Sequence, residues 1–460
     1  MTAEQKPFQS VAQPVPMLDL KRQYQPLHQE LLSALGSVLA SQQFILGEPV
    51  AAFERAAAAQ LGVAHAIGCS SGTDALWLAL AAAGIGPGHA VVTTPFSFFA
   101  STSAILRAGA QPLLADIDPA TFNLSPVAVE AVLNSPQGAA VRAILPVHLY
   151  GQCADWTSFA RIAKDHNLKL IEDAAQAWGA EWYGIQQAVE KPVSEGDGGL
   201  PGSPASDFCS LGWNFNPREK SMESMGALAP EEGVSGNPVS AVPRSQARKA
   251  GALGDAAAFS FYPTKNLSAA GDAGMVTTNS DELAERARML RQHGMRRRYH
   301  HDETGWNARM DGFQGAILSV KLRYIDTWNQ LRRTVARRYH ALFHAAGLVE
   351  AGPYPSHGPS GGIVLPQEVR GTRHVWHQYV IRTTRRDGLR QFLTERKIGS
   401  EIYYPVPLHL QEALKPLGYS EGSFPEAERA AREVLALPIF PELREDEQQT
   451  VVSAIAEFLS

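Results

Sequence analysis

The chain has 460 residues, of which 45% are hydrophobic and 19% are charged, and its formal net charge is −5. This composition is typical of a soluble globular protein, and the length predicts a large domain joined to a smaller one. The negative balance offers no basic field for nucleic acid or for an anionic membrane surface. We therefore expect neither nucleic acid nor membrane among the partners.

Cysteine usage and the N-terminal segment bear on compartment and metals. Cys69, Cys153 and Cys209 are too few for a disulfide framework and lack the spacing of a metal site. The first residues, MTAEQKPFQSVAQPVP, contain no apolar core of a signal peptide, and the run ALWLALAAAGIG is too short to span a bilayer. We expect a cytoplasmic protein that binds no metal.

From about residue 64 to residue 279, short β-rich runs alternate with helical patterns. The expected strands are AHAIG, HAVVTT, AQPLLADI, VRAILPVHL, LKLIEDA, AAAFSFY and GMVTTN. Between them, stretches such as 73–83 and 154–166 carry apolar residues at helical spacing. This alternation predicts a doubly wound α/β fold with a mostly parallel sheet. Ligands of such sheets bind beyond the carboxyl ends of the strands, so the residues that follow each strand are the candidates for chemistry.

The alternation is interrupted between residues 184 and 254. Stretches such as EGDGGLPGSPASD and EEGVSGNPVSAVPR are rich in Gly, Pro and Ser, which predicts a largely irregular insertion, with FCSLGWNFN as a piece that docks locally. Later, a long helical pattern runs through RYIDTWNQLRRTVARRYHALFHAAG and ends at Gly347. We expect a large α/β domain over residues 18–325 and a smaller C-terminal domain over residues 326–460.

The stretch GCSSGTDALWLAL, residues 68–80, places small residues between a strand and a helix. Backbone N–H groups of Ser71, Gly72 and Thr73 at a helix N-terminus are able to bind a phosphate. The alternative is an ordinary helix N-cap by Ser71 or Thr73, which for this motif alone is the more frequent case.

A second candidate is LKLIEDAAQAWGA, residues 168–180, where a hydrophobic strand ends in Glu172 and Asp173. An acid at the mouth of a parallel sheet needs a cationic partner or several donors. Asp173 is therefore either a capping carboxylate or the partner of a protonated heterocyclic nitrogen, and Gln176 follows one helical turn later.

The third candidate is Lys265, in FSFYPTKNLSAAG at residues 259–271. A lone lysine is most often a solvated surface charge. In a partly desolvated pocket, however, its pKa falls and it becomes a nucleophile toward carbonyl groups. Three features together predict pyridoxal 5′-phosphate (PLP): the phosphate-binding turn at residues 71–73, called the cup below, an acid for a ring nitrogen, and a buried lysine. This cofactor presents a phosphate, a ring nitrogen and an aldehyde.

The sequence resembles the DegT/DnrJ/EryC1/StrS family of PLP-dependent nucleotide-sugar aminotransferases, of fold type I. The matching stretches cover almost the whole chain except the insertion. They are VPMLDLKRQY, FILGEPVAAFE, SSGTDALWLAL, TTPFSFFAS, PVHLYGQCADW, IEDAAQAWGA, GDAAAFSFYPTKNLSAAGDAGMVTTN, RRRYHHDETGWNARMDGFQGAILSVKL and YYPVPLHLQEALKPLGY. The resemblance implies a large PLP-binding domain and a smaller α+β domain, with active sites shared across a homodimer.

The resemblance also implies the central chemistry. Lys265 would form the Schiff base with the cofactor, Asp173 would pair with the pyridinium nitrogen, and Gln176 would lie near the phenolic oxygen. An intact set of these groups argues against a sugar dehydratase or deoxygenating enzyme on the same scaffold, because a histidine replaces the lysine in the dehydratase relatives. It also argues against a non-catalytic regulatory protein.

Further cofactor contacts are implied by position. Gly72, Thr73 and Ser260 would hold the phosphate, and Phe99 would stack on the cofactor ring, although an aromatic residue after a strand is more often plain core. Asn307 would reach the phosphate of the neighbouring subunit's cofactor.

The substrate is predicted from basic and aromatic residues. In RQHGMRRRYHH, Arg298 and Tyr299 resemble a run found in family members that act at C3 of a keto sugar, and Tyr404 and His409 resemble the segment that closes over the sugar. We expect a dTDP- or UDP-linked 3-keto hexose as substrate and glutamate as amino donor. Trp178, an alanine before Gly274 and the insertion depart from the family pattern, which leaves the shape of the substrate pocket open.

Overall fold

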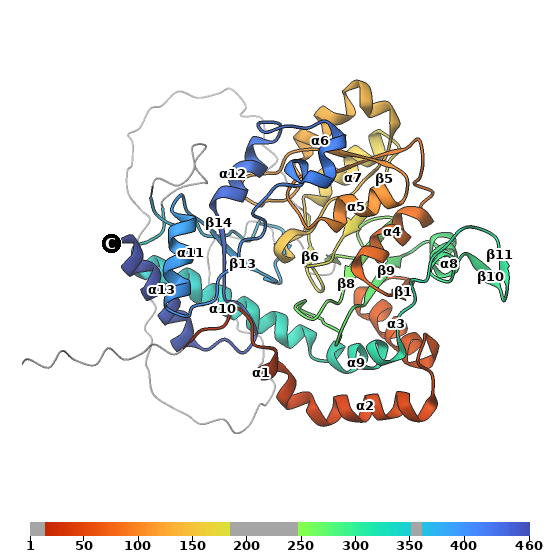
Figure 1. The fold of residues 1–460 in the computed structure, drawn as a ribbon, viewed down its shortest axis with the longest axis horizontal. Coiled ribbons are helices and arrows are strands. Elements are labelled where there is room, and N and C mark those ends of the chain that lie inside the picture. The colour runs from red at the N-terminus through yellow and green to blue at the C-terminus, as the bar shows by residue number, and fades with distance from the viewer. Residues whose placement is uncertain (1–13, 185–246, 351–360) are drawn as a thin grey trace, which may run out of the picture. The chain divides into compact units, whose positions relative to one another are not determined.

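A seven-stranded sheet forms the centre of the computed structural model, which describes residues 14–184, 247–350 and 361–460 (Figure 1). Its strands, in spatial order, are β1 (His65–Cys69), β9 (Gly274–Thr278), β8 (Ala256–Ser260), β5 (Lys169–Asp173), β4 (Val141–Ile144), β2 (Ala90–Thr93) and β3 (Gln111–Leu114). Only β9 runs antiparallel to its neighbours in this sheet. All seven runs predicted as strands are strands, and the predicted fold class is confirmed.

Helices follow the strands as the periodicity predicts. They are α1 (Leu20–Tyr24), α2 (His28–Ser41), α3 (Gly47–Leu61), α4 (Gly72–Ala82), α5 (Ala100–Arg107), α6 (Pro126–Leu133), α7 (Trp156–Asp165), α8 (Asp281–Leu290), α9 (Gly312–Leu322), α10 (Ile325–Ala345), α11 (Arg386–Glu395), α12 (Pro425–Glu433) and α13 (Glu445–Leu459). No helix in the described ranges is long and apolar enough to cross a bilayer.

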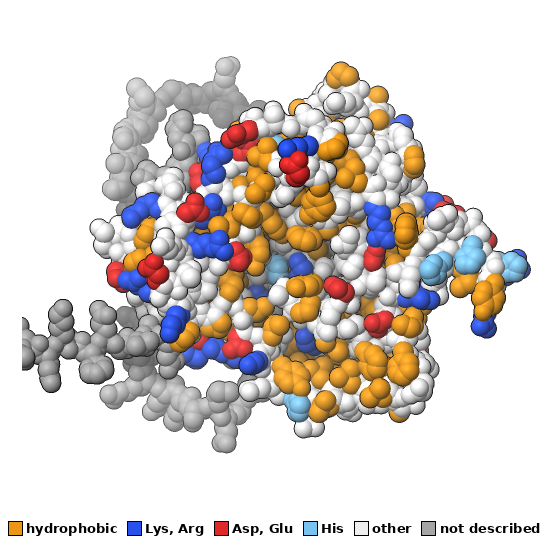
Figure 2. Space-filling view, in the orientation of Figure 1, with side chains coloured by type: hydrophobic (Ala, Val, Ile, Leu, Met, Phe, Trp, Pro, Cys, Tyr) orange, Lys and Arg blue, Asp and Glu red, His pale blue; other side chains and the backbone are white. Residues whose placement is uncertain are grey.

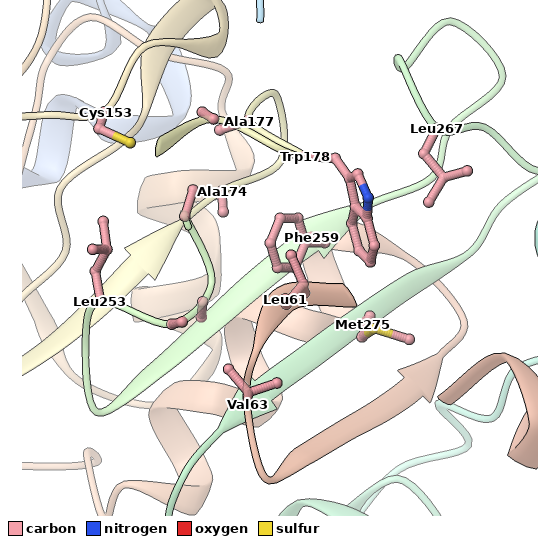
Figure 3. Packing of buried hydrophobic residues seen from close by; sticks show 14 of the residues in the cluster. Leu61, Val63, Cys153, Ala174, Ala177, Trp178, Leu253, Phe259, Leu267 and Met275 are labelled. Carbon is pink, nitrogen blue, oxygen red and sulfur yellow. The ribbon is translucent and has the colours of Figure 1, made fainter. Parts of the chain in front are cut away.

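Hydrophobic packing covers both faces of the sheet because successive strand residues point to opposite sides. In β8, Ala257 and Phe259 belong to one buried cluster, whereas Ala256 and Ala258 belong to another. In the first cluster, Trp178 lies against Phe259 with ring centroids 4.8 Å apart (Figure 3). Trp178 therefore packs within the core of the sheet.

A third buried cluster lies mainly in the C-terminal part. It is built around α10, α12, α13 and the antiparallel pair β13 (Tyr379–Arg382) and β14 (Val434–Leu437). Phe96, Phe122 and Tyr150 join this cluster from segments that flank the large sheet. All described residues belong to one compact unit, so the division at residues 325/326 stays a prediction.

Only the two ends of the predicted irregular insertion, residue 184 and residues 247–254, lie within the described residues. Most of it, including FCSLGWNFN, lies outside the described residues. Its last part differs from the expectation, because β7 (Arg248–Lys249) pairs with β6 (Glu181–Trp182), which in turn pairs with β12 (Thr372–Arg373). A short sheet therefore joins the end of this segment to the body of the unit.

A hairpin extends away from α8 and the sheet. It consists of β10 (Met295–Arg297) and β11 (His300–His301), and its side chains are exposed except that of Met295, which is half-buried (Figures 1 and 2). The segment that follows returns to the sheet, where the amide of Ser70 donates to the carbonyl of Ala308 at 3.1 Å.

Candidate cofactor site

Two glycines allow the first turn of α4 to approach the ends of β8 and β9. A Cβ atom on Gly72 would lie 2.5 Å from Cβ of Ser260, and one on Gly274 would lie 2.1 Å from the carbonyl oxygen of Ser71. Neither distance leaves room for a side chain. The structure therefore brings together the three residues predicted to hold a phosphate, since Thr73 follows Gly72 in the same turn.

The capping interpretation of this turn is also correct for one residue. Ser71 is the N-cap of α4, and its hydroxyl accepts a hydrogen bond from the amide of Asp74 at 3.1 Å. The side chain of Thr73 forms no hydrogen bond with any described residue. Because Ser71 caps only the amide of Asp74, the earlier amides of α4 and the hydroxyl of Thr73 are free to bind an anion.

Asp173 ends β5 and is 4% exposed. Its carboxylate accepts hydrogen bonds from the hydroxyl of Ser101 at 2.7 Å and from the amide of Ala175 at 3.2 Å. Burial raises the pKa of Asp173, and these donors together with the charges of Lys265 and His148 oppose the rise. A cationic ring nitrogen would favour the ionised form further.

Lys265 lies in the turn after β8, where its amide donates to the carbonyl of Tyr262 at 2.8 Å. It is half-buried, not a solvated surface charge. Desolvation lowers the pKa of Lys265 to about 8, and the charge of Asp173 opposes the fall. The amine is therefore unprotonated in a far larger fraction of molecules near neutral pH than an ordinary lysine, which suits a nucleophile.

Gln176 links Asp173's surroundings to the C-terminal part of the chain. Its Oε1 accepts the amide hydrogen of Tyr150 at 2.6 Å, and its Nε2 donates to the hydroxyl of Tyr404 at 3.1 Å. Burial raises the pKa of Tyr404, so the phenol stays protonated. The structure thus places the predicted substrate residue Tyr404 beside the predicted cofactor residue Gln176.

The aromatic residues before α5 divide into two kinds of position. Phe99 is 36% exposed and makes no aromatic contact among the described residues. Phe98 is 59% exposed, and its ring centroid lies 6.4 Å from that of Tyr404. Sequence reasoning missed Phe98, although it stands beside Phe99 in the same motif. Stacking by Phe99 stays a prediction, and the contact with Tyr404 makes Phe98 a second candidate.

Three predicted residues lie in the exposed segment that carries the hairpin. Arg298 packs on Tyr299, which is 77% exposed, and Asn307 accepts a hydrogen bond from Nε of Arg309 at 3.0 Å. No hydrogen bond or ion pair among the described residues joins them to Lys265 or to Asp173. Their predicted roles therefore stay predictions.

His409 occupies a different environment from the one predicted. It is 1% exposed, its Nε2 bonds to the carboxylate of Glu428 at 2.9 Å, and its ring packs on Phe424. Its Nδ1 is enclosed without a partner among the described residues. This environment favours a structural role for His409, because no face of the imidazole is open to a sugar.

Several groups beside the site were not anticipated from the sequence. Ser101 and His148 lie near Asp173, and Asn266 and His377 form a buried pair beside Lys265. The role of Glu172 could have been predicted from the sequence, because successive residues of a strand point to opposite sides and Glu172 therefore points away from Asp173. Its carboxylate accepts hydrogen bonds from the loop at residues 253–254. The other four depend on contacts between distant segments. The described residues contain no group of three or more His, Cys, Asp or Glu side chains able to hold a metal.

Comparison with known proteins defines the class. The profile of the DegT/DnrJ/EryC1/StrS aminotransferase family matches residues 26–197 and 237–456. The chain belongs to this family and is an aminotransferase whose cofactor is PLP. The site fits that cofactor, because its cup, acid and lysine correspond to the phosphate, the ring nitrogen and the aldehyde.

Three relatives match nearly the full chain. A "pleiotropic regulatory protein" of Geobacillus stearothermophilus is 44% identical and is covered over 98% of its length, with 96% of this chain. A dTDP-3-amino-3,4,6-trideoxy-alpha-D-glucose transaminase of Streptomyces venezuelae is 36% identical, with 96% of each chain covered. A UDP-N-acetyl-3-dehydro-alpha-D-glucosamine 3-aminotransferase of Acidithiobacillus ferrooxidans is 35% identical, with 97% of this chain and 98% of the relative covered.

Solved structures agree with the family assignment. DesV of S. venezuelae, solved in complex with a ketimine intermediate, superposes with a TM-score of 0.77 at 36% identity, covering 97% of this chain and 99% of that one. NtdA of Bacillus subtilis, solved with bound cofactor PMP, superposes with a TM-score of 0.74 at 25% identity, covering 99% of this chain and 87% of that one.

Proposed function

We propose that this enzyme transfers an amino group from glutamate to the keto group of a nucleotide-linked sugar, with a dTDP- or UDP-linked 3-keto hexose as the substrate. The observation that carries the proposal is the half-buried Lys265, whose lowered pKa reflects desolvation and whose charge interacts with that of Asp173, together with the cup at the start of α4. The names of two relatives, which act at C3 of dTDP- and UDP-linked sugars, support the substrate class.

Each group has a task that its surroundings support. Gly72, Thr73 and Ser260 would bind the cofactor's phosphate, and Asp173 would keep the ring nitrogen protonated. When bound, PLP supplies an electron sink for the carbon atom that exchanges its amino group. Nζ of Lys265 would hold the cofactor covalently at rest and then move a proton to and from that carbon as general acid and base.

The proposal includes a homodimer with shared sites. Two features support it: the exposed position of Asn307 after the hairpin, and an apolar surface over α2 and the start of α3 (Figure 2). Leu39 on α2 is 54% exposed, and Ile45, before α3, is 50% exposed. Large apolar side chains that gather on a surface mark protein contacts. Asn307 would then donate to the phosphate bound by the partner chain.

Purified holoenzyme tests the function directly. Glutamate is added to follow the loss of absorbance of the lysine-bound cofactor, and dTDP- and UDP-linked 3-keto and 4-keto sugars are then compared for amino-sugar formation. We expect turnover with a 3-keto sugar and none for Lys265→Ala. Absence of product from every sugar, with a cofactor that glutamate does convert, would disprove the substrate assignment.

A regulatory role is the second candidate, because the 44% identical relative carries that name. The same experiment separates the two functions. In a purely regulatory protein, glutamate would leave the bound PLP unchanged. In a protein whose Lys265 and Asp173 act as proposed, glutamate would convert the bound PLP to its amino form.

A further inference from the structure

Asn266, which directly follows Lys265, is buried and uses its whole carboxamide. It is 5% exposed. Its Nδ2 donates to Oδ1 of Asn329 on α10 at 2.8 Å and to the carbonyl oxygen of Val375 at 3.1 Å, and its Oδ1 lies 3.1 Å from Nδ1 of His377. The turn that carries Lys265 is therefore fastened to α10 and to residues 375–377.

The hydrogen-bond partners determine the tautomer of His377. A backbone carbonyl such as that of Val375 only accepts, so the Asn266 atom that faces it must be the amide nitrogen. The amide of Asn329 is oriented in the same way, because its Nδ2 donates to the carbonyl of Trp178 at 2.9 Å. Oδ1 of Asn266 consequently faces His377, and Nδ1 of His377 must carry the hydrogen.

His377 is held close to the site by its backbone as well. Its amide donates to the carbonyl of Tyr150 at 2.9 Å, and Tyr150 in turn donates its own amide hydrogen to Gln176. The imidazole is 8% exposed. Burial lowers the pKa of His377 well below its usual value, and the charges of Lys265, Arg332 and His374 lower it further. The ring is therefore neutral, and its single hydrogen is the one on Nδ1.

We propose that His377 and Asn266 are positioning residues for the reaction: the hydrogen bond from Nδ1 of His377 to Asn266 holds the turn of Lys265 in its desolvated setting. The inference rests on the proposed role of Lys265. Loss of this bond would leave the buried amide oxygen of Asn266 without a donor, and the turn would shift toward water. Because Lys265 owes its reactivity to desolvation, a looser turn raises the pKa of its amine.

Two substitutions of His377 separate the two ring nitrogens. The amide nitrogen of asparagine takes the place of Nδ1, whereas that of glutamine takes the place of Nε2. The pKa of Lys265 is read in the full-length chain, freed of cofactor, from the rate at which an amine reagent labels Lys265 between about pH 6 and pH 10, by mass spectrometry. This measurement needs no substrate, so it remains informative if the proposed function is wrong.

We expect His377→Asn to keep the wild-type midpoint near 8. His377→Gln and Asn266→Ala should raise the midpoint by about one pH unit or more, which is a tenfold loss of free amine. Tyr339→Phe is the matched control: it removes a buried hydrogen bond, 3.0 Å long, from α10 to Pro438 without touching the Lys265 turn. Its midpoint should not move.

The proposal is wrong if His377→Asn shifts the midpoint as much as His377→Gln does, or if neither variant shifts it. Circular dichroism identifies a variant that fails to fold. If His377→Gln is the variant that fails to fold, Asn266→Ala decides in its place, because it removes the same hydrogen bond from the other partner, and an unchanged midpoint in Asn266→Ala would overturn the proposal.

Discussion

Replacing Glu172 by glutamine should loosen the loop that closes the end of the insertion. Glu172 is completely buried on β5, next to Asp173. Its Oε1 accepts the amides of Leu253 and Gly254, each at 2.8 Å, and its Oε2 accepts the amide of Gly251 at 2.7 Å and Nε2 of His148 at 3.0 Å. All four partners act as donors, so only a carboxylate satisfies them all.

The free energy lost in Glu172→Gln follows from the number of donors left without an acceptor. Nδ1 of His148 accepts the amide of Ala154 at 3.1 Å, so Nε2 must keep its hydrogen and cannot become an acceptor. The amide nitrogen of a glutamine would face two donors in either orientation. Two hydrogen bonds to a charged group, each worth about 1.5 to 3 kcal/mol, would be lost, about 3 to 6 kcal/mol in total.

Hydrogen exchange measures this loss locally, without requiring reversible unfolding of the whole chain. For Glu172→Gln we expect the amides of residues 250–255 to exchange roughly 10² to 10⁴ times faster than in the wild type. Glu285→Gln is the control, since Glu285 makes an exposed ion pair with Arg296 that is worth at most about 1 kcal/mol. Exchange within a few-fold of the wild type in Glu172→Gln would refute the reasoning.

Three further predictions concern the cofactor site. In Gly274→Ala, the new Cβ would collide with the carbonyl of Ser71, so the affinity for PLP measured by absorbance should fall more than tenfold; unchanged affinity would mean that the cup is elsewhere. The rate at which the cofactor-free chain takes up PLP should rise with pH and level off above about 8, because the lowered pKa leaves about one Lys265 amine in ten neutral at pH 7; a rise that continues to pH 10 would contradict this. Mixed Lys265→Ala and Asn307→Trp subunits should recover up to roughly a quarter of the wild-type activity, whereas strict additivity after subunit exchange would show that each site lies within one chain.

The strands of the large sheet and the positions of Asp173 and Lys265 could be predicted from local sequence patterns. All seven strands follow from runs of apolar and β-branched residues, and the helix that starts at Gly72 follows from its capping pattern and apolar periodicity. Both signals are local, because they depend on residues within a few positions of one another. Asp173 and Lys265 were found because each follows its own strand, and in a parallel sheet such positions meet at one edge.

The contacts that support these groups could not be predicted from the sequence, because they come from segments far apart along the chain. The surroundings of Asp173 include Ser101, and the turn of Lys265 is tied to His377, which is more than a hundred residues away along the chain. His409 looked like a substrate residue in its motif, yet folding enclosed it against Glu428. Burial and hydrogen bonding at each of these residues depend on which distant segments pack together, and no local pattern encodes that choice.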